Sequence, residues 1–240
     1  MRLAIITGGS KGLGFALCTQ FSKLGYRVLE FSRTAPHKFS VCVDLSLPED
    51  SRRCIASAIA AFDTASLSEL VVINNAGTLE PIGPSSKKLS PALLANLNTN
   101  FTSSILGLTE IIAKFQPAPC RKIVVNISSG AAQKGYAGWS LYCAAKAGME
   151  GFIRALAIEQ QAEPYPFIPI NIDPGVIDTE MQALIRASTA LDFPDLDRFV
   201  RRKELGGLVA PSEVAAAVLR ILDSRSLSYG GRYDASNTDA

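Results

Sequence analysis

Histidine is nearly absent from this sequence of 240 residues, in which His37 is the only one. A Ser-His-Asp arrangement needs a histidine beside a nucleophile, and residues 34–39 lie far along the chain from any plausible one. A metal site built on histidine is equally unsupported. We therefore expect no bound metal, and we predict that His37 is a solvated loop residue.

Cysteine is also scarce, and its spacing argues against two further kinds of site. The five cysteines are odd in number and contain no Cys-x-x-Cys pair; they are Cys18, Cys42, Cys54, Cys120 and Cys143. This pattern fits neither a disulfide framework nor a zinc site. We expect reduced thiols in a cytoplasmic protein.

Long hydrophobic runs and a large excess of one charge are missing as well. No apolar run reaches the roughly 18 residues of a membrane span, and the N-terminus enters a strand-like segment without a secretory signal. The 24 basic and 22 acidic residues give a net charge of +2. The basic clusters Arg52-Arg53 and Arg201-Arg202-Lys203 are short and contain no aromatic residue. We interpret them as solvated helix faces and expect neither a nucleic-acid nor a membrane partner.

Short apolar segments alternate with helix-like stretches along the whole chain. The expected strands are 3–7, 27–31, 40–43, 70–74, 122–127, 167–172 and 231–233, and the expected helices are 12–24, 48–62, 91–115, 137–161 and 211–223. These strands are apolar throughout, which predicts a parallel sheet covered on both faces. The sequence therefore predicts an α/β fold, a single doubly wound Rossmann-type domain over residues 1–240. The short connection 34–39 predicts a turn where such folds usually have a helix.

A glycine pattern, Gly8-x-x-x-Gly12-x-Gly14, follows the first strand and opens the first helix. Glycines let backbone N–H groups approach phosphate, and a helix N-terminus supplies partial positive charge. An ordinary tight turn is the alternative. A strand before the pattern and a helix after it favour a site for the pyrophosphate of a dinucleotide.

Two basic residues bear on which dinucleotide binds. Lys11 lies inside the glycine pattern, and Arg33 follows the second strand, where such folds meet the adenosine ribose. A cation suits a 2′-phosphate and an acid suits a 2′-hydroxyl, so we expect NADP rather than NAD, with Glu30 as the competing acid. Asp44 is expected to accept from the adenine amino group or to cap the helix that begins at Pro48.

Tyr142 and Lys146 are one helical turn apart and therefore share a helix face. An ammonium beside a phenol lowers its pKa from about 10, which makes the phenol a better proton donor and acceptor at neutral pH. Alone the pair is weak evidence, because most such pairs lie on solvated helix surfaces.

The motifs together resemble the short-chain dehydrogenase/reductase family over essentially the whole chain. Thr7-Gly-x-x-x-Gly-x-Gly14, Asn74-Asn-Ala-Gly77, Asn100, Asn126-Ile-Ser-Ser129, Tyr142-x-x-x-Lys146 and Pro174-Gly175 occur in the order and at the spacings of that family. The resemblance implies a nicotinamide-dependent oxidoreductase acting on a carbonyl or alcohol. Alternatives are a regulator that binds a dinucleotide without turnover, and an alcohol dehydrogenase or 3-oxoacyl reductase of the same fold.

The resemblance also implies roles for individual residues. Ser129, thirteen residues before Tyr142, would orient the carbonyl and Tyr142 would deliver the proton. Lys146 would lower the pKa of the tyrosine and hold the nicotinamide ribose, while Asn100 would position a water molecule. Asn100 could instead bend or cap a helix, and Ser129 could satisfy an N–H group at a strand end.

The expected cofactor contacts come from strand ends and the loops that follow them. They are Gly8, Ser10, Lys11, Gly12, Leu13, Gly14, Ser32, Arg33, Asp44, Leu45, Asn75, Ala76, Gly77, Tyr142, Lys146, Pro174, Gly175, Val176 and Thr179. Thr179 could also cap a helix ahead of Glu180, and the motif at 74–77 could act chiefly in stabilising the sheet.

Residues 176–207 read as a lid over the substrate, with a two-helix surface insertion as the alternative. Within the family the likeness is to sepiapterin reductases and bacterial benzil reductases, through Gly138-Trp-x-Leu-Tyr-Cys-Ala-x-Lys146, Asp178-Thr-x-Met-Gln182 and Gly230-Gly-Arg-Tyr-Asp234. It implies an aromatic or vicinal dicarbonyl substrate and a homodimer or homotetramer. The expected substrate contacts are Ser129, Tyr136, Trp139, Tyr142, Met181, Gln182 and Asp234. Asp173 departs from the small or amide residue expected before Pro174.

Overall fold

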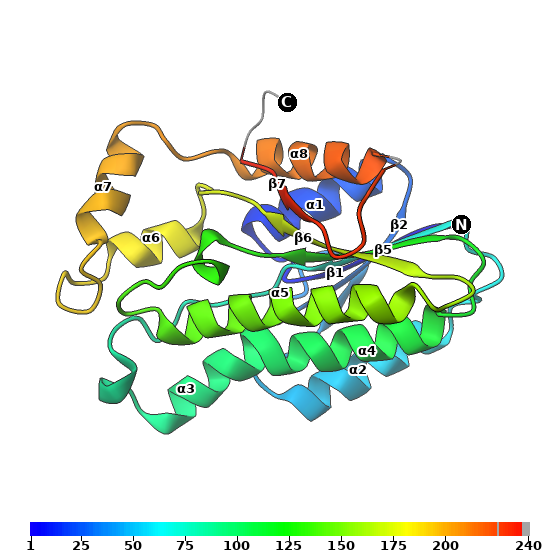
Figure 1. Ribbon diagram of the computed structural model, residues 1–240, viewed down its shortest axis with the longest axis horizontal. Helices are drawn as coiled ribbons and strands as arrows, with labels where there is room; N and C mark the ends of the chain where they lie inside the picture. The colour runs from blue at the N-terminus through cyan, green and yellow to red at the C-terminus, as the bar shows by residue number, and fades with distance from the viewer. Residues whose placement is uncertain (225, 237–240) are drawn as a thin grey trace.

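The apolar segments form one parallel sheet in the computed structural model, which describes residues 1–224 and 226–236 (Figure 1). The strands are β1 (Arg2–Thr7), β2 (Arg27–Ser32), β3 (Ser40–Cys42), β4 (Glu69–Asn74), β5 (Arg121–Ile127), β6 (Phe167–Asp173) and β7 (Arg232–Asp234). They pair in parallel in the order β3-β2-β1-β4-β5-β6-β7. The chain changes direction across the sheet between β1 and β4, and a crevice is expected outside the carboxyl ends of strands at such a point.

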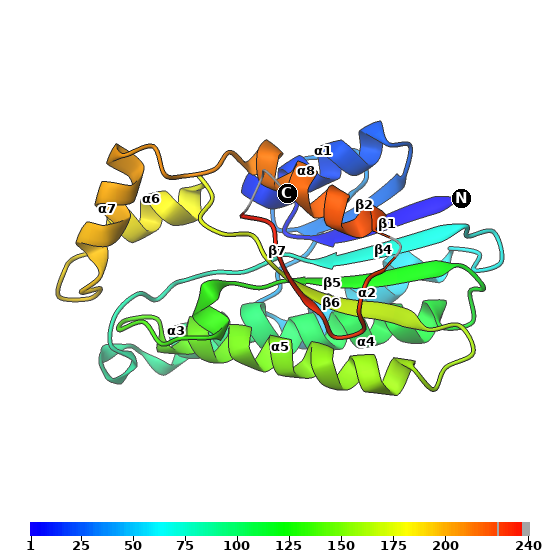
Figure 2. The same cartoon turned by 45° about the horizontal axis from the view of Figure 1, so that its top comes forward.

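Helices cover both faces of the sheet, which confirms the predicted doubly wound architecture (Figures 1 and 2). The helices α1 (Gly12–Lys23) and α8 (Pro211–Asp223) lie on one face, and α2 (Pro48–Ala60), α4 (Ser103–Phe115) and α5 (Ser140–Gln160) lie on the other. In β1, Leu3 and Ile5 pack toward α2, α4 and α5, while Ala4 and Ile6 pack toward α1 and α8. Because successive side chains of a strand point to opposite faces, a strand between two helical layers is apolar throughout.

The single helix predicted over 91–115 is wrong. The segment forms α3 (Ser90–Leu97), a π-helical turn (Asn98–Thr102) and then α4. Side-chain amides around the turn bond to other parts of the chain: Asn98 Nδ2 donates to the Ser46 carbonyl at 3.0 Å, and Asn100 Nδ2 donates to the Thr78 carbonyl at 2.8 Å. These anchors hold the wider turn in place.

The helix α5 (Ser140–Gln160) starts later than expected, and the connection after β2 has the expected form. The helix expected from residue 137 begins only at Ser140, because Gly138 adopts a left-handed φ of 84° and its N-terminal neighbours form a loop. The connection 33–39, all of which the structure describes, contains no helix, as predicted. Among residues 1–224 and 226–236, no helix combines the length and the apolar character needed to cross a bilayer.

The segment 176–207 forms two helices, α6 (Glu180–Arg186) and α7 (Leu196–Glu204), which project beyond the sheet at the left of Figure 1. A parallel bridge between Ile177 and Val209 ties the base of this segment together. Its apolar residues pack on rings from the start of α5. We call the five rings concerned the aromatic cluster: Tyr136, Trp139, Tyr142, Phe193 and Phe199. The segment is therefore packed against the carboxyl edge of the sheet.

A ladder of three buried amides crosses the centre of the sheet. Asn74 Nδ2 donates to Asn126 Oδ1 at 3.1 Å, and Asn126 Nδ2 donates to Asn171 Oδ1 at 2.9 Å. The three residues share one register on β4, β5 and β6. The amides therefore satisfy one another in the core, which supports a structural role for Asn74 rather than contact with a cofactor.

Candidate active site

The ends of four neighbouring strands bring the motifs of the sequence together. Gly8 follows β1, Asn75 follows β4, Ser128 follows β5 and Pro174 follows β6. In a parallel sheet these ends meet at one edge, so residues far apart in the chain become neighbours. The candidate site is built on this edge.

The glycine pattern allows α1 to pack very closely on β1. A Cβ on Gly14 would lie 2.1 Å from the Gly8 carbonyl oxygen, and a Cβ on Gly8 would lie 2.8 Å from Ala76 Cα. Gly8 and Gly12 also adopt left-handed φ values of 70° and 56°. Larger residues would force the loop apart, so the glycines are required by the backbone itself.

Thr7 and Asn75 brace this loop against the end of β4. Thr7 Oγ1 accepts from the N–H groups of Asn75 and Ala76, each at 3.1 Å. Asn75 Nδ2 donates to the carbonyl oxygens of Thr7 and Gly8, each at 3.0 Å. Thr7 belongs to the glycine motif, but the motif alone indicates no role for its hydroxyl. The contact joins residues more than sixty positions apart in the chain, so it has no local signal in the sequence.

Glu30 and His37 both contact Gly9 of the glycine loop. The Glu30 side chain is fully buried, and its Oε1 accepts from Gly9 N–H at 2.8 Å. His37 Nε2 lies 3.0 Å from the Gly9 carbonyl oxygen, and its ring lies 4.8 Å from each of the rings of Phe15 and Phe39. His37 is a loop residue, as predicted, but it is only partly solvated, because the glycine loop and two phenylalanine rings pack on it. Glu30 is turned toward the glycine loop and away from solvent.

The two predicted basic residues lie in different settings. Arg33 is exposed directly after β2, whereas Lys11 forms an ion pair with Glu180 at the start of α6. Thr179, the N-cap residue of α6, places its methyl 3.1 Å from where a Cβ on Gly12 would lie. The segment 176–207 therefore contacts the glycine loop twice, through Glu180 on Lys11 and through Thr179 on Gly12.

The remaining expected adenosine-side contacts are engaged in turns. Asp44 Oδ1 accepts from Ser46 N–H at 2.9 Å, while the N-cap of α2 is Leu47. The alternative of Asp44 as a helix cap is therefore wrong, because its carboxylate closes the turn before the helix. Ser32 Oγ accepts from Ala35 N–H at 3.2 Å.

Ser129 and Tyr142 meet at the end of β5. Ser129 Oγ accepts from Ala131 N–H at 3.1 Å and so caps the short 3₁₀ turn Gly130–Ala132. The Ser129 side chain also lies close enough to the Tyr142 phenol to lower the pKa of that phenol. Ser129 therefore binds a backbone N–H group, the alternative that the sequence left open, and it also lies beside the tyrosine.

Burial raises the pKa of Tyr142 to about 12; the Ser129 side chain opposes this effect and the nearby Asp173 carboxylate adds to it. Lys146 Nζ instead donates to the Ile127 carbonyl at 2.7 Å and lies 5.6 Å from the centre of the Tyr142 ring. The expectation that the lysine lowers the pKa of this phenol is wrong for the cofactor-free protein, because burial dominates. Tyr142 consequently keeps its proton at neutral pH.

Burial also acts on Lys146, and lowers its pKa to about 8. The carboxylates of Asp173 and Glu150 oppose this shift, since negative charge favours the ammonium form. The group is therefore mainly protonated at pH 7 and mainly neutral above pH 8.

Asn100 lies within the π-helical turn and is only 3% exposed. Its Oδ1 accepts from Thr78 N–H at 2.8 Å, and its Nδ2 donates to Asn96 Oδ1 at 2.9 Å. A Cβ on Gly77 would lie 3.1 Å from Asn100 Oδ1 and 3.9 Å from Lys146 Nζ. Asn100 therefore borders the lysine and anchors the segment after β4, and its place in the turn fits the helix-bending alternative as well.

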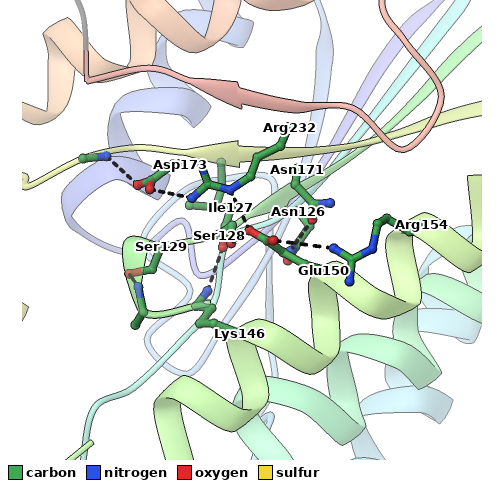
Figure 3. A network of polar contacts seen from close by, with 12 residues as sticks. Asn126, Ile127, Ser128, Ser129, Lys146, Glu150, Arg154, Asn171, Asp173 and Arg232 are labelled. Atoms are coloured by element: carbon green, nitrogen blue, oxygen red, sulfur yellow. Dashed lines mark hydrogen bonds and ion pairs between the residues drawn. The ribbon is translucent and has the colours of Figure 1, made fainter. Parts of the chain in front are cut away.

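A charged network that the sequence did not reveal lies behind Lys146 (Figure 3). Arg232, on β7, donates from Nη2 to Asp173 Oδ2 at 2.8 Å and from Nε to Glu150 Oε1 at 3.0 Å. The Ser128 hydroxyl donates to the same Glu150 oxygen at 2.5 Å. Asp173 stands where a small or amide residue was expected before Pro174. It is one end of an ion-paired group that joins β6, β7 and α5.

The expected substrate residues lie around the start of α5, on α6 and on β7. Trp139 stacks on Phe193 at a centroid distance of 4.5 Å and meets the Tyr142 ring edge-on at 6.2 Å. Tyr136 and Met181 pack on the same cluster, and Gln182 is buried on α6. Asp234 lies apart from the rings, since its carboxylate accepts from Ser236 N–H at 2.7 Å.

Residues 2–190 match the family model for short chain dehydrogenases. The chain belongs to this family. It is 38% identical over 239 residues to a benzil reductase ((S)-benzoin forming) of Bacillus subtilis, covering 98% of each chain. It is also 29% identical to a sepiapterin reductase of Xenopus tropicalis, covering 97% of this chain and 95% of that one.

Solved structures give the same assignment. The chain matches the crystal structure of the KRED1-Pglu enzyme with a TM-score of 0.80 and 28% identity, covering 97% of this chain and 100% of the other. The protein is therefore an oxidoreductase of the short-chain family, whose fold binds a nicotinamide dinucleotide and acts on small molecules with C=O or CH–OH groups.

The residues at the strand ends fit a nicotinamide dinucleotide. The first turn of α1 opens from the glycine loop and carries no acidic side chain, so its N–H groups and positive end suit phosphate. At the other end of the edge, residue 77 is a glycine, so no side chain stands between the backbone there and the Lys146 ammonium. Both ends of a dinucleotide thus have suitable partners.

The network behind Lys146 yields a first prediction. Replacing Arg232 with methionine removes the only cation bridging Glu150 and Asp173 among the described residues. We expect the free energy of unfolding in urea to fall by about 2 kcal/mol, less than the ~3–5 kcal/mol of a fully buried pair because Arg232 is partly exposed.

Arg154→Met is the matched control for this change. Its guanidinium lies 3.7 Å from Glu150 and its side chain is 60% exposed, so its loss should cost no more than about 0.5 kcal/mol. Equal losses in the two variants would contradict the role given to Arg232.

Proposed function

We propose that this protein is an NADPH-dependent carbonyl reductase that converts an aromatic or vicinal dicarbonyl compound to a secondary alcohol. One observation carries the proposal: the buried Tyr142 phenol lies close to the Ser129 side chain and belongs to the aromatic cluster. A proton donor beside an apolar wall of rings is what the reduction of an aromatic ketone requires.

The nicotinamide, when bound, supplies the hydride for the carbonyl carbon. In this proposal the Ser129 hydroxyl donates a hydrogen bond to the substrate oxygen and stabilises the negative charge that develops there. Tyr142 then transfers its phenolic proton to that oxygen. An alkoxide is a far stronger base than a phenolate, so a phenol with a pKa of about 12 is a competent donor.

Lys146 and Asn100 complete the proposed catalytic set. The Lys146 ammonium, with a pKa near 8, is available at neutral pH to bind the ribose hydroxyls of the cofactor and to return a proton toward the phenol. Asn100 fixes the backbone at Thr78, and this keeps the end of β4 in place beside the lysine.

The preference for NADP rests on the charges at the end of β2. Arg33 is exposed there, while the competing Glu30 carboxylate is buried and accepts from Gly9 N–H. A ribose 2′-hydroxyl would find no acid at this strand end, whereas a 2′-phosphate would find a guanidinium. Lys11 takes part only if its ion pair with Glu180 opens.

The substrate class rests on the aromatic cluster and on the relatives. Benzil reductases of Bacillus subtilis and Bacillus cereus are 38% and 34% identical to this chain over nearly its whole length. The phenyl rings of such diketones suit an apolar surface formed by Tyr136, Trp139 and Met181. We further propose a cytoplasmic homodimer or homotetramer, in which the exposed Ile158 of α5 and Leu94 of α3 would be covered.

The Tyr142→Phe variant tests the proposed reaction. With benzil as substrate, we expect NADPH oxidation to fall by about 10³-fold, because the proton donor is lost while the ring and its packing remain. NADPH binding, followed by fluorescence, should stay within a factor of two or so of the unchanged protein. Tyr165→Phe, on an exposed ring, is the control and should keep the full rate.

Reduction that survives in Tyr142→Phe would refute the mechanism. Absence of NADPH oxidation with benzil, sepiapterin and simple aromatic ketones in the unchanged protein would refute the proposed substrate class.

The Arg33→Ser variant tests the cofactor preference. Removing the guanidinium should raise the KM for NADPH about tenfold, the equivalent of ~1.4 kcal/mol, and leave the KM for NADH nearly unchanged. Lys38→Ser, an exposed cation of the same loop, is the control. A parallel change for both cofactors would rule out a contact between Arg33 and the 2′-phosphate.

A further inference from the structure

The helix α7 has an apolar side and a basic side, and the basic side has no role in the site described so far. Leu196 and Phe199 pack toward the aromatic cluster. Arg198, Arg201 and Arg202 lie three and four residues apart and so share the opposite side. The sequence had suggested a solvated helix face for Arg201-Arg202.

This arginine side forms one wall of an open cleft of about 820 Å³. The other lining residues include Leu205, Gly207 and Val209 from the segment after α7, and Val176 and Ser236 from the segments after β6 and β7. The volume lies within the roughly 300–1,000 Å³ of small-molecule sites. The arginines therefore border a concave surface, unlike a helix face that bulges into solvent.

The charges of the cleft are unbalanced. Three guanidinium groups face it against one carboxylate, that of Asp197. Within residues 1–224 and 226–236, the side chains of Arg198, Arg201 and Arg202 have no ion-pair or hydrogen-bond partner, whereas the neighbouring Lys203 donates to Asp178 Oδ2 at 2.6 Å. Guanidinium groups of this kind bind carboxylate and phosphate oxygens in pairs.

The cleft adjoins the loop that borders the reacting groups. A Cβ on Gly175 would lie 2.3 Å from Ser236 Cβ, and Ala235 N–H donates to the Asp173 carbonyl at 2.8 Å. The Asp173 carboxylate is in turn 3.9 Å from where a Cβ on Gly130, next to Ser129, would lie. Val176 and Ser236 are thus shared walls between the cleft and this end of the sheet.

We propose that the cleft binds a carboxylate or phosphate group carried by the carbonyl substrate, so that the enzyme prefers anionic ketones to neutral ones of the same shape. The inference rests on the proposed function, since it names the class of that substrate more closely. Arg198, Arg201 and Arg202 supply the attraction and Asp197 weakens it.

Two diketones that differ by one carboxylate, benzil and 4-carboxybenzil, provide the test. For the unchanged protein with NADPH we expect a KM for 4-carboxybenzil about tenfold below that for benzil. In Arg198→Gln/Arg202→Gln this ratio should fall toward one, and in Asp197→Asn it should rise. Arg53→Gln, an exposed arginine of α2, is the control and should keep the ratio of the unchanged protein. A ratio of one in the unchanged protein, or a ratio that the double variant does not alter, overturns the proposal.

A binding experiment separates this inference from the proposed function. With NADP⁺ in place of NADPH no reduction can occur, and calorimetry gives the affinity for each diketone directly. Arginine-dependent preference for 4-carboxybenzil without reduction of either compound by NADPH would overturn the proposed function and leave the cleft assignment intact. Reduction of both compounds with equal affinities would do the reverse.

Inorganic phosphate distinguishes an anion carried by the substrate from a free anion. Phosphate that competes with 4-carboxybenzil and leaves benzil reduction unaltered supports the proposal. Phosphate that changes benzil reduction equally would identify a site for a free anion and overturn it.

Discussion

The burial of a phenol and an ammonium side by side is the constraint on which the rest of this molecule depends. Burial disfavours the charged form of both groups, so Tyr142 keeps its proton and Lys146 holds its proton weakly. The ammonium is tolerated because the Ile127 carbonyl accepts from it and the carboxylates of Asp173 and Glu150 lie near. Arg232 then balances those carboxylates from β7, so the last strand of the sheet supports the chemistry of α5.

The sheet supplies the precision that this arrangement needs. Ser129 follows the end of β5, and the ends of the central strands are fixed by the amides of Asn74, Asn126 and Asn171 and by the brace between Thr7 and Asn75. Residues 176–207 pack against the same edge through the aromatic cluster, and this places apolar rings beside Tyr142.

Most of the fold was predictable from the sequence, because strands buried on both faces must be apolar throughout and motifs of fixed spacing mark their ends. Three of the failures share one cause, which is long-range contacts. The π-helical turn depends on amide bonds to Ser46 and Thr78, and the setting of His37 depends on the loop that packs over it. The pKa of Tyr142 depends on burial, which helical spacing to Lys146 cannot reveal.

The most direct test of this account is the titration of Tyr142 itself in the cofactor-free protein. Carbon-13 labelling at tyrosine Cζ, with Tyr142→Phe to assign the resonance, would follow the ionisation of this one phenol by NMR. The account predicts a Tyr142 signal that stays constant from pH 6 to about 10 and titrates with a pKa of about 12. A midpoint below about 9 would show that charge from Lys146 outweighs burial, and would contradict it.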